Sequence, residues 1–469
     1  MFKDKRYFVL GAAKSGTAAA AFLAERGARV WINDLKERAS LDEAVLSDLE
    51  SMGVTCILGE HGNPAELGAD YVVQSPGVPY NSPPSARARA AGIPLIGEIE
   101  LAYSVCRAEI LAVTGTNGKT TTTALLGQML RDGGRDVFVG GNIGVPFILH
   151  ADSLRPDQLA VLEVSSFQLE TVESFRPGIS VILNVTPDHL ERHGGFENYL
   201  AAKANIFKNQ KASDRLILNW DDPLTRSLAE HAEARILFFS GKQELEEGAF
   251  LRDGALTVRA PEREGGLACG LVHRNELKIP GAHNIENALA ALLAGWVMGV
   301  PAGRLRHSLR TFPGVAHRLE PVLEREGVLF VNDSKGTNTD ASIKAIEAFE
   351  RPIVLIAGGL GKGGDYGPFA ELIRRKVKYV ALIGQDAEKI RRSLEKAGFT
   401  RWAYAEDMES AVRQARDAAE AGDVVLLSPA CASYDMFRDF EQRGDVFKEI
   451  VRRVAGKEDC HGSEEEKRA

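Results

Sequence analysis

The segment at residues 111–130, LAVTGTNGKTTTTALLGQML, constrains the fold of this chain more than any other. An apolar run enters a glycine-rich turn, and a lysine followed by a run of threonines opens an amphipathic helix. Glycines let main-chain N–H groups converge, and the helix N-terminus adds unpaired donors and the positive end of the helix dipole. The pattern predicts a strand, a turn and a helix that bind the phosphates of a nucleoside triphosphate.

Two side chains of this turn have specific predicted roles. Lys119 is expected along the β- and γ-phosphates, and the hydroxyl of Thr120 is expected to bind Mg²⁺. The strict pattern has Gly at its first position, where this chain has Val113, so a helix that merely begins with Gly, Lys and Thr is the alternative. The predicted nucleotide-binding residues of the turn are Gly115, Thr116, Asn117, Gly118, Lys119, Thr120 and Thr121.

The composition bounds the class of protein. A chain of 469 residues is too long for one hydrophobic core, and ordinary domain sizes predict roughly three domains. Hydrophobic content of 44% and charged content of 26% are typical of a soluble globular protein, and the net charge of −8 argues against a general nucleic-acid binder. Scattered cysteines without a C-x-x-C pair favour a reducing cytoplasm and indicate no zinc site, and no membrane span is evident.

Strand-like and helix-like segments alternate along the chain, which predicts an α/β protein with three domains. We expect a Rossmann-like N-terminal domain at 1–97, a central P-loop ATPase-like domain at 98–314 and a Rossmann-like C-terminal domain at 315–455. Residues 456–469 are charged and poor in apolar side chains, so a disordered tail is expected there.

The first glycine-rich turn leaves alternatives open. Its sequence GAAKSG, at 11–16, lacks the middle glycine of the dinucleotide-binding pattern G-x-G-x-x-G, although Asp34 after the second strand could bind a ribose hydroxyl. A nicotinamide-dependent dehydrogenase is one alternative, disfavoured by this turn and by the P-loop downstream. A regulatory P-loop switch is another, and it would leave the Lys, Ser and Arg residues of the third domain unexplained.

Several segments together resemble the Mur ligases in order and spacing, over nearly the whole chain except the tail. They are VTGTNGKTT, GGNIG, LEVSSFQLE, NVTPDHLERHG, YLAAKANIF, GAHNIENALAA, HRLE, NDSKGTNTDA, GGLGKGGD and SPACASYDMFRDFEQRG. The family tolerates a residue other than Gly where Val113 stands. The NDSK-x-TN and SPACAS-x-D-x-F segments imply the member that adds D-glutamate to UDP-N-acetylmuramoyl-L-alanine in peptidoglycan precursor synthesis. Another amide ligase of the superfamily, such as a folylpolyglutamate synthase, is the alternative, but that relative begins directly with the triphosphate domain.

The resemblance implies an ATP-dependent amide ligase. The γ-phosphoryl group of ATP would activate a carboxylate as an acyl phosphate, which an amine then attacks, and the site must neutralise charge, exclude water and hold three reactants. The implied partners are small molecules: ATP, D-glutamate and UDP-N-acetylmuramoyl-L-alanine, with Mg²⁺ as two ions. A cytoplasmic monomer with no nucleic-acid partner is expected.

Four residues are predicted around the reacting groups. Glu163 ends an apolar strand, where a carboxylate would face Mg²⁺, although an exposed acid at a strand end is the alternative. The resemblance implies that His189 binds a second Mg²⁺ and that Lys203 is carbamylated and bridges the ions. Without the resemblance, Lys203 reads as a surface lysine. Asn142 would hydrogen-bond the reacting end of the substrate, or would simply be a turn asparagine with positive φ.

Four further residues are implied to bind ATP. Asn284 and Asn287 would face the adenine, and the alternative is that they cap the apolar helix that follows. Arg318 would meet the γ-phosphate after domain closure, and Asp333 the ribose or a metal-bound water. The alternative for this second pair is an ordinary ion pair between domains.

The resemblance also implies contacts for the other two substrates. In the N-terminal domain, Ser15, Lys36 and Gly77 correspond to positions near the uridine diphosphate. The residues implied around the glutamate are Lys335, Thr337, Lys362, Ser433 and Phe440. A lysine suits a side-chain carboxylate and hydroxyl groups supply neutral donors, whereas Phe440 could be a core residue.

We predict that Lys362→Ala raises the KM for glutamate about tenfold or more, because an unpaired desolvated carboxylate costs about 2–5 kcal/mol. The KM values for ATP and the UDP-sugar should change much less, because their implied sites lie mainly in the other two domains. Steady-state kinetics with one substrate varied at a time would measure this. A glutamate KM within roughly a factor of two of the wild-type value would remove Lys362 from the site.

Overall fold

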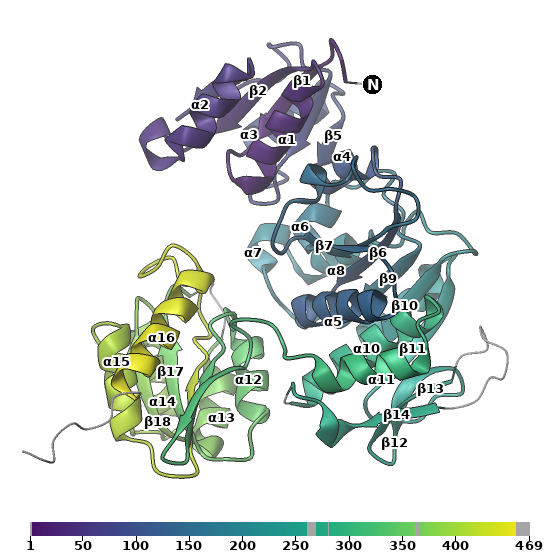
Figure 1. The fold of residues 1–469 in the computed structure, drawn as a ribbon. Coiled ribbons are helices and arrows are strands. Elements are labelled where there is room, and N and C mark those ends of the chain that lie inside the picture. The colour runs from purple at the N-terminus through teal and green to yellow at the C-terminus, as the bar shows by residue number, and fades with distance from the viewer. Residues whose placement is uncertain (1, 260–268, 280, 362–364, 456–469) are drawn as a thin grey trace, which may run out of the picture. The chain divides into compact units, whose positions relative to one another are not determined.

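The computed structural model describes residues 2–259, 269–279, 281–361 and 365–455, which form three β-sheets in chain order (Figure 1). The chain divides into two compact units. The first unit comprises the residues up to Leu277 together with Ile285–Phe312. The second unit comprises Lys278–Asn284 together with the residues from Pro313 onward. The tail predicted at 456–469 lies outside the described residues. No helix in the described ranges is long and apolar enough to cross a bilayer.

The first sheet is parallel throughout, with strand order β3-β2-β1-β4-β5. Its strands are β1 (Arg6–Leu10), β2 (Arg29–Asp34), β3 (Thr55–Leu58), β4 (Tyr71–Gln74) and β5 (Leu95–Gly97). Its helices are α1 (Lys14–Glu25), α2 (Glu43–Ser51) and α3 (Pro83–Ala90), with the short helix η1 (Arg38–Ser40). The strand order reverses between β1 and β4, and ligands of open α/β sheets bind at such a point.

The second sheet belongs to the same unit and has strand order β14-β13-β12-β11-β10-β9-β6-β8-β7 within the described residues. Its strands are β6 (Glu109–Thr114), β7 (Val137–Gly141), β8 (Leu159–Glu163), β9 (Ile179–Ile182), β10 (Arg215–Asn219), β11 (Arg235–Ser240), β12 (Gly248–Arg252), β13 (Ala255–Arg259) and β14 (Cys269–His273). The strands from β7 to β12 pair in parallel, and β12, β13 and β14 pair antiparallel.

The helices that follow these strands are mostly short. They are α4 (Glu98–Tyr103), α5 (Lys119–Asp132), η2 (Phe147–Leu149), α6 (Ser166–Leu169), α7 (Leu190–His193), α8 (Phe196–Ala204), α9 (Pro223–Ser227), η3 (Leu228–His231), η4 (Arg274–Glu276), α10 (Ala282–Val297) and α11 (Ala302–Thr311). Helix α5 packs against β6, β7, β8 and α11, and it buries a run of threonines followed by leucine and methionine side chains. Helix α10 carries a continuous buried apolar stretch from Ala288 to Ala294.

The second unit contains the third sheet, with order β15-β16-β20-β17-β18-β19, in which only the pairing of β15 with β16 is antiparallel among the pairs described. Its strands are β15 (Glu320–Arg325), β16 (Val328–Asn332), β17 (Ile353–Gly358), β18 (Val377–Ile383), β19 (Trp402–Tyr404) and β20 (Val424–Leu427). Its helices are α12 (Thr339–Glu347), α13 (Gly367–Lys376), α14 (Ala387–Lys396), α15 (Met408–Asp417) and α16 (Phe440–Val454). Separate apolar clusters lie on its two faces, as expected for a sheet covered on both sides.

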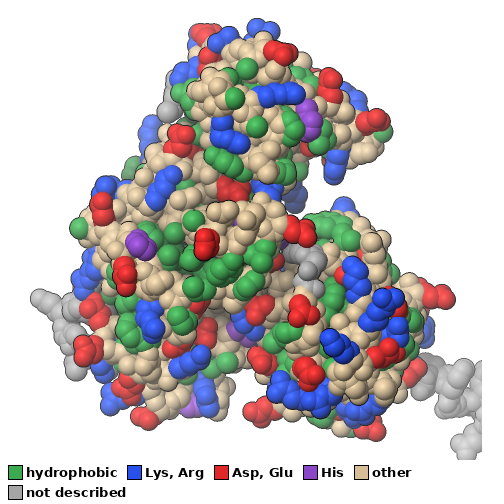
Figure 2. All heavy atoms as spheres, turned by 180° about the vertical axis from the view of Figure 1, so that it is seen from behind, with side chains coloured by type: hydrophobic (Ala, Val, Ile, Leu, Met, Phe, Trp, Pro, Cys, Tyr) green, Lys and Arg blue, Asp and Glu red, His purple; other side chains and the backbone are tan. Residues whose placement is uncertain are grey.

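The predicted α/β class with three domains is therefore confirmed. The strands are short apolar runs, and the turns between strand and helix carry the glycines and the polar residues. Figure 2 shows Lys and Arg side chains interspersed with Asp and Glu over the visible face.

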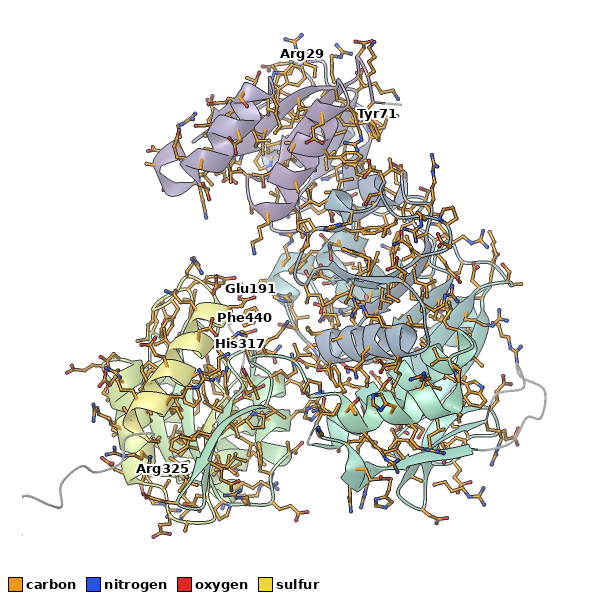
Figure 3. All side chains as sticks on the ribbon, in the orientation of Figure 1. Arg29, Tyr71, Glu191, His317, Arg325 and Phe440 are labelled. Carbon is orange, nitrogen blue, oxygen red and sulfur yellow. The ribbon has the colours of Figure 1, made fainter. Side chains whose placement is uncertain are left out.

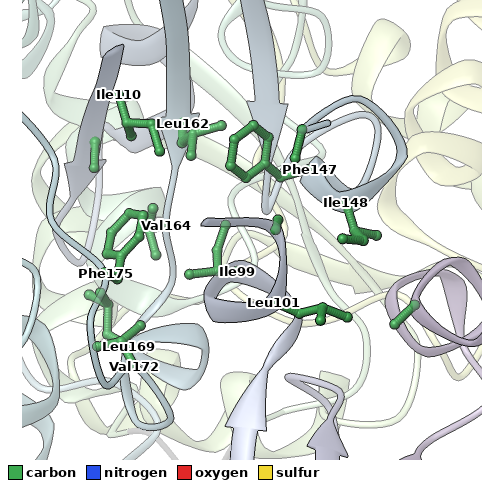
Figure 4. Packing of buried hydrophobic residues seen from close by; sticks show 14 of the residues in the cluster. Ile99, Leu101, Ile110, Phe147, Ile148, Leu162, Val164, Leu169, Val172 and Phe175 are labelled. Carbon is green, nitrogen blue, oxygen red and sulfur yellow. The ribbon is translucent and has the colours of Figure 1, made fainter. Parts of the chain in front are cut away.

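The apolar core is continuous between the first two sheets, and helix α4 lies within it. Ile99 and Leu101 of α4 are buried among Phe147, Leu162 and Phe175 of the central domain (Figure 4). The same cluster includes apolar residues of β1 and α1 in the N-terminal domain. Apolar burial of this kind is the main favourable term in folding, so it explains why these two domains form one compact unit.

Two acidic side chains of α4 are buried in this core with different partners. Glu100 accepts hydrogen bonds from the main-chain N–H groups of Glu173, Ser174 and Phe175 at 2.8–3.0 Å. Glu98 accepts one from the N–H of Ile148 at 2.7 Å, and its Oε2 has no hydrogen-bond partner among the described residues. Burial raises the pKa of Glu98 to about 7, because desolvation penalises the charged carboxylate.

We predict that Glu98 makes the folded protein less stable as pH rises. Its pKa is raised to about 7 in the fold from an ordinary value of 4.5, so the unfolded chain releases this proton first. The contribution of Glu98 to the free energy of unfolding is fully present below the pKa of the unfolded chain. It is lost as pH rises through the pKa of the folded state, by about 3 kcal/mol in total. Glu98→Gln, which is neutral at every pH, should gain stability relative to the wild type as pH rises.

Denaturant unfolding of both proteins between about pH 5 and pH 8 measures this difference. Glu109→Gln, at the exposed start of β6, is the matched control and should follow the wild type. Parallel stability curves for Glu98→Gln and the wild type over that range would contradict the prediction.

Candidate active site

The predicted phosphate turn has the expected strand–turn–helix form. Strand β6 ends at Thr114, the turn uses positive φ at Gly115 (153°) and Gly118 (87°), and α5 begins at Lys119. Val113, which departs from the strict pattern, is a fully buried residue of β6. Gly is not required there, because this position is ordinary strand and not part of the turn.

The register of the sheet brings Glu163 to this turn. Val113 of β6 pairs with Glu163 at the end of β8, which in turn pairs with Gly141 at the end of β7. The carboxylate of Glu163 accepts hydrogen bonds from Thr120 Oγ1 at 2.7 Å and from Asn142 Nδ2 at 2.8 Å. Glu163 is only 2% exposed, so the alternative of a solvated acid at a strand end is wrong.

The other neighbour of β6 supplies residues that the sequence did not single out. Asn184, just after β9, accepts from the N–H of Asn117 at 2.9 Å through its side chain and from the N–H of Thr116 at 2.9 Å through its carbonyl. The hydroxyl of Thr116 lies 3.0 Å from that of Tyr199 and donates to the carbonyl of Thr186 at 3.1 Å. The position of Asn184 at a strand end and the i, i+4 spacing of Tyr199 from Lys203 were the available signals.

Two lysines lie against the carbonyl of Gly115. Lys119 Nζ donates to it at 2.8 Å, and Lys203 Nζ donates to it at 2.7 Å from α8. Lys203 is 1% exposed, so the surface-lysine alternative is wrong. Burial, together with the positive charge of Lys119, holds the pKa of Lys203 well below its usual range, against the opposing effect of the Asp188 and Glu163 carboxylates. The amine of Lys203 is therefore readily neutral.

His189 lies at the start of α7 in a left-handed conformation, with φ of 54°. Its Nε2 is 3.5 Å from a carboxylate oxygen of Asp188, and its ring meets the ring of Phe167 edge-on at 4.9 Å. The side chain is one-third exposed, so it remains accessible to a ligand.

The donors around the turn suit a hard cation. Thr120 and Glu163 provide oxygen atoms, which Mg²⁺ prefers, and Mg²⁺ usually keeps waters and substrate phosphates as its other ligands. Within the described residues, no three His, Cys, Asp or Glu side chains group as a complete metal site. The oxygen atoms of Thr120 and Glu163 thus suit an ion whose other ligands are waters and nucleotide phosphates.

Helix α10 carries the two asparagines predicted to bind adenine. Asn284 and Asn287 are buried, at 2% and 3% exposure. A Cβ atom added to Gly118 would lie 2.1 Å from Asn287 Oδ1, so Asn287 closely approaches the phosphate turn and requires glycine there. Asn284 lies inside the first turn of α10, which begins at Ala282, so the helix-capping alternative is wrong for both asparagines.

In the second unit, Asp333 follows β16 and is 2% exposed. Its carboxylate accepts hydrogen bonds from the N–H of Leu319 at 3.2 Å and from Ser428 Oγ at 2.7 Å. Burial raises the pKa of Asp333 to about 6, and the charge of Arg318 opposes this rise. Arg318 Nε is buried and has no hydrogen-bond partner among the described residues.

The residues predicted around glutamate are partly grouped in the same unit. Lys335 Nζ lies 5.1 Å from the centre of the Phe440 ring, and that ring meets His317 edge-on at 6.1 Å (Figure 3). The N–H of Thr337 donates to the carbonyl of Lys335 at 2.9 Å, and Ser433 is buried at 2% exposure. Lys362 lies outside the described residues.

Arg443 is a buried residue of this region that the sequence did not single out. It is 1% exposed and donates to Ser334 Oγ at 2.9 Å and to the carbonyl of Ser334 at 2.7 Å. It also donates to the carbonyls of Cys431 and Ala432 at 3.1 and 3.2 Å. Arg443 thereby holds the segment before Lys335 against the segment before Ser433. The FEQRG run that contains it was the available signal.

A cavity of about 330 Å³ opens at the carboxyl ends of β1, β2 and β4. Lys36 and Gly77 line it, whereas Ser15 lies in the first turn of α1 and is not among the lining residues. The carboxylate of Asp34 accepts from the N–H groups of Ala12 at 2.8 Å and of Lys36 at 2.9 Å. Asp34 thus ties the glycine-rich turn at residues 11–16, through Ala12, to the segment that begins after β2.

The fold and the turn around Lys119 define a P-loop nucleotide-binding enzyme. Three family models match the chain in order. They describe a Mur ligase MurD-like N-terminal domain at residues 5–97, a Mur ligase middle domain at 113–295 and a Mur ligase glutamate ligase domain at 317–431.

Curated relatives match over nearly the full length. A UDP-N-acetylmuramoylalanine--D-glutamate ligase of Pelotomaculum thermopropionicum is 48% identical over 450 residues, which cover 96% of this chain and 98% of that protein. The protein of the same name from Caldanaerobacter subterraneus is 47% identical, again over 96% and 98%. Among solved structures, UDP-N-acetylmuramate-alanine ligase MurC of Thermotoga maritima has a TM-score of 0.59 at 22% identity, covering 97% of this chain and all of that one. It shares the fold.

The chain therefore belongs to the Mur ligase family and is an ATP-dependent amide ligase.

We predict that Lys119→Ala lowers ATP-dependent turnover by about 100-fold or more, because it removes a cation from the transferring phosphoryl group. The fold should survive, since Lys119 is only half-buried and its Nζ contacts main-chain carbonyls. Lys208→Ala is the matched control, because Lys208 also donates to a main-chain carbonyl, that of Val172, in the same unit. Phosphate release and circular dichroism measure activity and fold, and turnover like that of the wild type would overturn the role of Lys119.

Proposed function

We propose that this ligase joins the amine of D-glutamate to the carboxylate of UDP-N-acetylmuramoyl-L-alanine at the expense of ATP, as a step of peptidoglycan precursor synthesis. One observation carries the proposal: the buried carboxylate of Glu163 accepts from Thr120 of the phosphate turn and from Asn142 of the GGNIG loop. A single carboxylate thus joins the phosphate site to the loop implied to hold the reacting end of the substrate. The names of the relatives support the two substrates.

The reaction has two balanced steps. A carboxylate oxygen of the UDP-linked substrate attacks the γ-phosphorus of ATP, the bond to the β,γ-bridging oxygen breaks, and ADP leaves. The neutral amine of glutamate then attacks the carbonyl carbon of the acyl phosphate, loses a proton, and inorganic phosphate leaves as the amide forms. The first step needs positive charge around the phosphoryl oxygens, which Lys119 and the N–H groups at the start of α5 supply.

Mg²⁺ would supply charge neutralisation at the phosphates, and two ions are proposed. Thr120 and Glu163 would hold one, and His189 with a carbamate on Lys203 would hold the other. A carbamate forms when the neutral amine attacks CO₂ and a proton is released, which converts a cation into an anion. The lowered pKa of Lys203 supports this, because a buried amine beside another lysine favours the neutral form.

The nucleotide contacts are proposed as follows. Asn284 and Asn287 would bind the adenine, because a side-chain amide can form hydrogen bonds with the edge of the base. Asn287 also closely approaches Gly118 of the phosphate turn. Arg318 would meet the γ-phosphate, and Asp333 would accept from the ribose or from a metal-bound water. The remaining turn residues, Gly115, Thr116, Asn117 and Thr121, would surround the phosphates.

The other two substrates are assigned to separate regions. The cavity lined by Lys36 and Gly77 has the place in the sheet where α/β folds bind nucleotides, so it would take the uridine diphosphate, with Ser15 at its margin. The residues proposed for glutamate are Lys335, Thr337, Lys362, Ser433 and Phe440. We further infer domains at 1–97, 98–314 and 315–455, and a monomer that works in the cytoplasm.

Phosphate release with ATP and Mg²⁺ tests the function. Release should require both UDP-N-acetylmuramoyl-L-alanine and D-glutamate, and mass spectrometry should detect their amide. L-glutamate, other D-amino acids and folate substrates are the comparison arms. Equal turnover with L-glutamate, or turnover without a UDP-linked acceptor, would contradict the proposal.

We predict that Lys203→Ala loses activity by about 100-fold or more, and that added short carboxylates restore part of it by replacing the carbamate oxygens. Depletion of CO₂ and bicarbonate should slow the wild type, and their return should restore it. Activity should also fall as pH drops through the lowered pKa of Lys203, since protonation removes the nucleophile for CO₂.

The control is Lys211→Ala, because Lys211 is an exposed lysine paired with Glu233 at 3.3 Å. Enrichment with ¹³C-bicarbonate should give a carbamate signal in the wild type and not in Lys203→Ala. An unchanged rate after both bicarbonate depletion and mutation of Lys203 would show that no bridging carbamate is needed.

A further inference from the structure

Helix α7 is a single turn whose direction is tightly defined. It follows His189, with φ of 54°, and ends at Gly194, with φ of 69°, so left-handed residues bound it on both sides. Figure 3 marks its position by Glu191. The N–H groups of Arg192 and His193 both donate to the carbonyl of His189, at 3.1 and 3.2 Å. These bonds fix the main chain of Arg192 relative to His189.

The guanidinium of Arg192 meets three consecutive carbonyls of the N-terminal domain. Nη2 donates to the carbonyl of Val78 at 2.6 Å and to that of Pro76 at 3.3 Å, and Nη1 donates to that of Gly77 at 3.3 Å. Gly77 and Val78 line the cavity proposed for uridine diphosphate. A planar fork with several donors can bind three acceptors at once, which a lysine ammonium on a flexible stem does less well.

The other side of Arg192 is anchored in the central domain. Its guanidinium lies 4.8 Å from the centre of the Phe167 ring, and Nη2 is 3.4 Å from the carboxylate of Glu170. Glu170 also accepts from His193 Nδ1 at 2.9 Å, and His193 Nε2 lies 3.1 Å from Ser166 Oγ. The Arg192 side chain is only 16% exposed, so these interactions are partly shielded from water.

These contacts connect the two ends of the proposed substrate path. Helix α6 contains Phe167 and is followed at once by Glu170, and it begins shortly after Glu163 at the end of β8. We propose that Arg192 is a positioning residue that holds the segment 76–78, and with it the diphosphate end of the UDP-linked substrate, at a defined distance from the site of phosphoryl transfer. This inference rests on the proposed function. Arg192 contacts neither the reacting carboxylate nor ATP in this scheme.

The segment 75–78 has its own hydrogen bonds within the N-terminal domain. The N–H of Ser75 donates to the carbonyl of Leu10 at 2.9 Å, the N–H of Val78 to that of Ser75 at 3.0 Å, and Gln74 Nε2 to the carbonyl of Val78 at 3.0 Å. The cavity should therefore keep its shape without Arg192. What should be lost is the alignment of a long substrate that must occupy both the cavity and the transfer site.

The experiment compares Arg192→Met, Arg192→Lys and a control, Arg226→Met, in the full-length ligase. Arg226 is a suitable match because it also lies over an aromatic ring, that of Trp220 at 5.1 Å, and donates to a carbonyl in the same unit. In Arg192→Met, the KM for UDP-N-acetylmuramoyl-L-alanine should rise about tenfold, while the KM for ATP and the Kd for UDP alone, by calorimetry, stay within roughly twofold. Arg192→Lys should recover part of the loss, and Arg226→Met should match the wild type.

Other outcomes would overturn the inference. A merely structural role would lower the active fraction, and so reduce kcat with every KM unchanged. A parallel loss of affinity for UDP alone would make Arg192 part of the nucleotide cavity and not a link between sites. If the wild type itself fails to join the two substrates, the proposed function is wrong. If the wild type is active and Arg192→Met has the same kcat and KM values, only the proposed role of Arg192 is wrong.

Discussion

The buried carboxylate of Glu163 is the interaction on which the site depends. Glu163 is the last residue of β8, which lies between β6 and β7 in the sheet. Thr120, beyond the turn that follows β6, and Asn142, directly after β7, therefore reach its carboxylate from either side. A slip of the strand register by one residue would turn this side chain to the other face of the sheet. An isolated buried carboxylate is costly, and here hydrogen bonds from Thr120 and Asn142 offset that cost.

Charge around this carboxylate explains the chemistry of the neighbouring lysines. Lys119 and Lys203 both reach the carbonyl of Gly115, and two adjacent ammonium groups would repel each other in a buried site. The more deeply buried Lys203 is the one whose pKa is lowered, because its amine is desolvated and lies near the positive charge of Lys119, so Lys203 can lose its proton. Burial and the neighbouring charge thus make one of two chemically identical side chains a potential nucleophile, while the other lies at the start of α5 beside the phosphate turn.

Much of the site was predictable because its signals are local. The strand, turn and helix around Lys119 follow from a contiguous pattern of apolar, glycine and polar residues, and the structure has them as expected. The capping alternative for Asn284 fails only because α10 begins at Ala282, and helix ends are poorly specified by sequence. Ser15 was assigned by resemblance, yet it is not among the residues that line the cavity.

Sequence alone determined the α/β class, the phosphate turn and the residue types available for catalysis, because these depend on periodicity and on short motifs. Tertiary structure decided which of those residues meet. The contacts of Thr116 with Tyr199, of Arg192 with the carbonyls at 76–78 and of Arg443 with Ser334 join segments far apart in the chain. Such pairings depend on strand order and on the burial of each side chain, and neither is encoded in any local stretch of sequence.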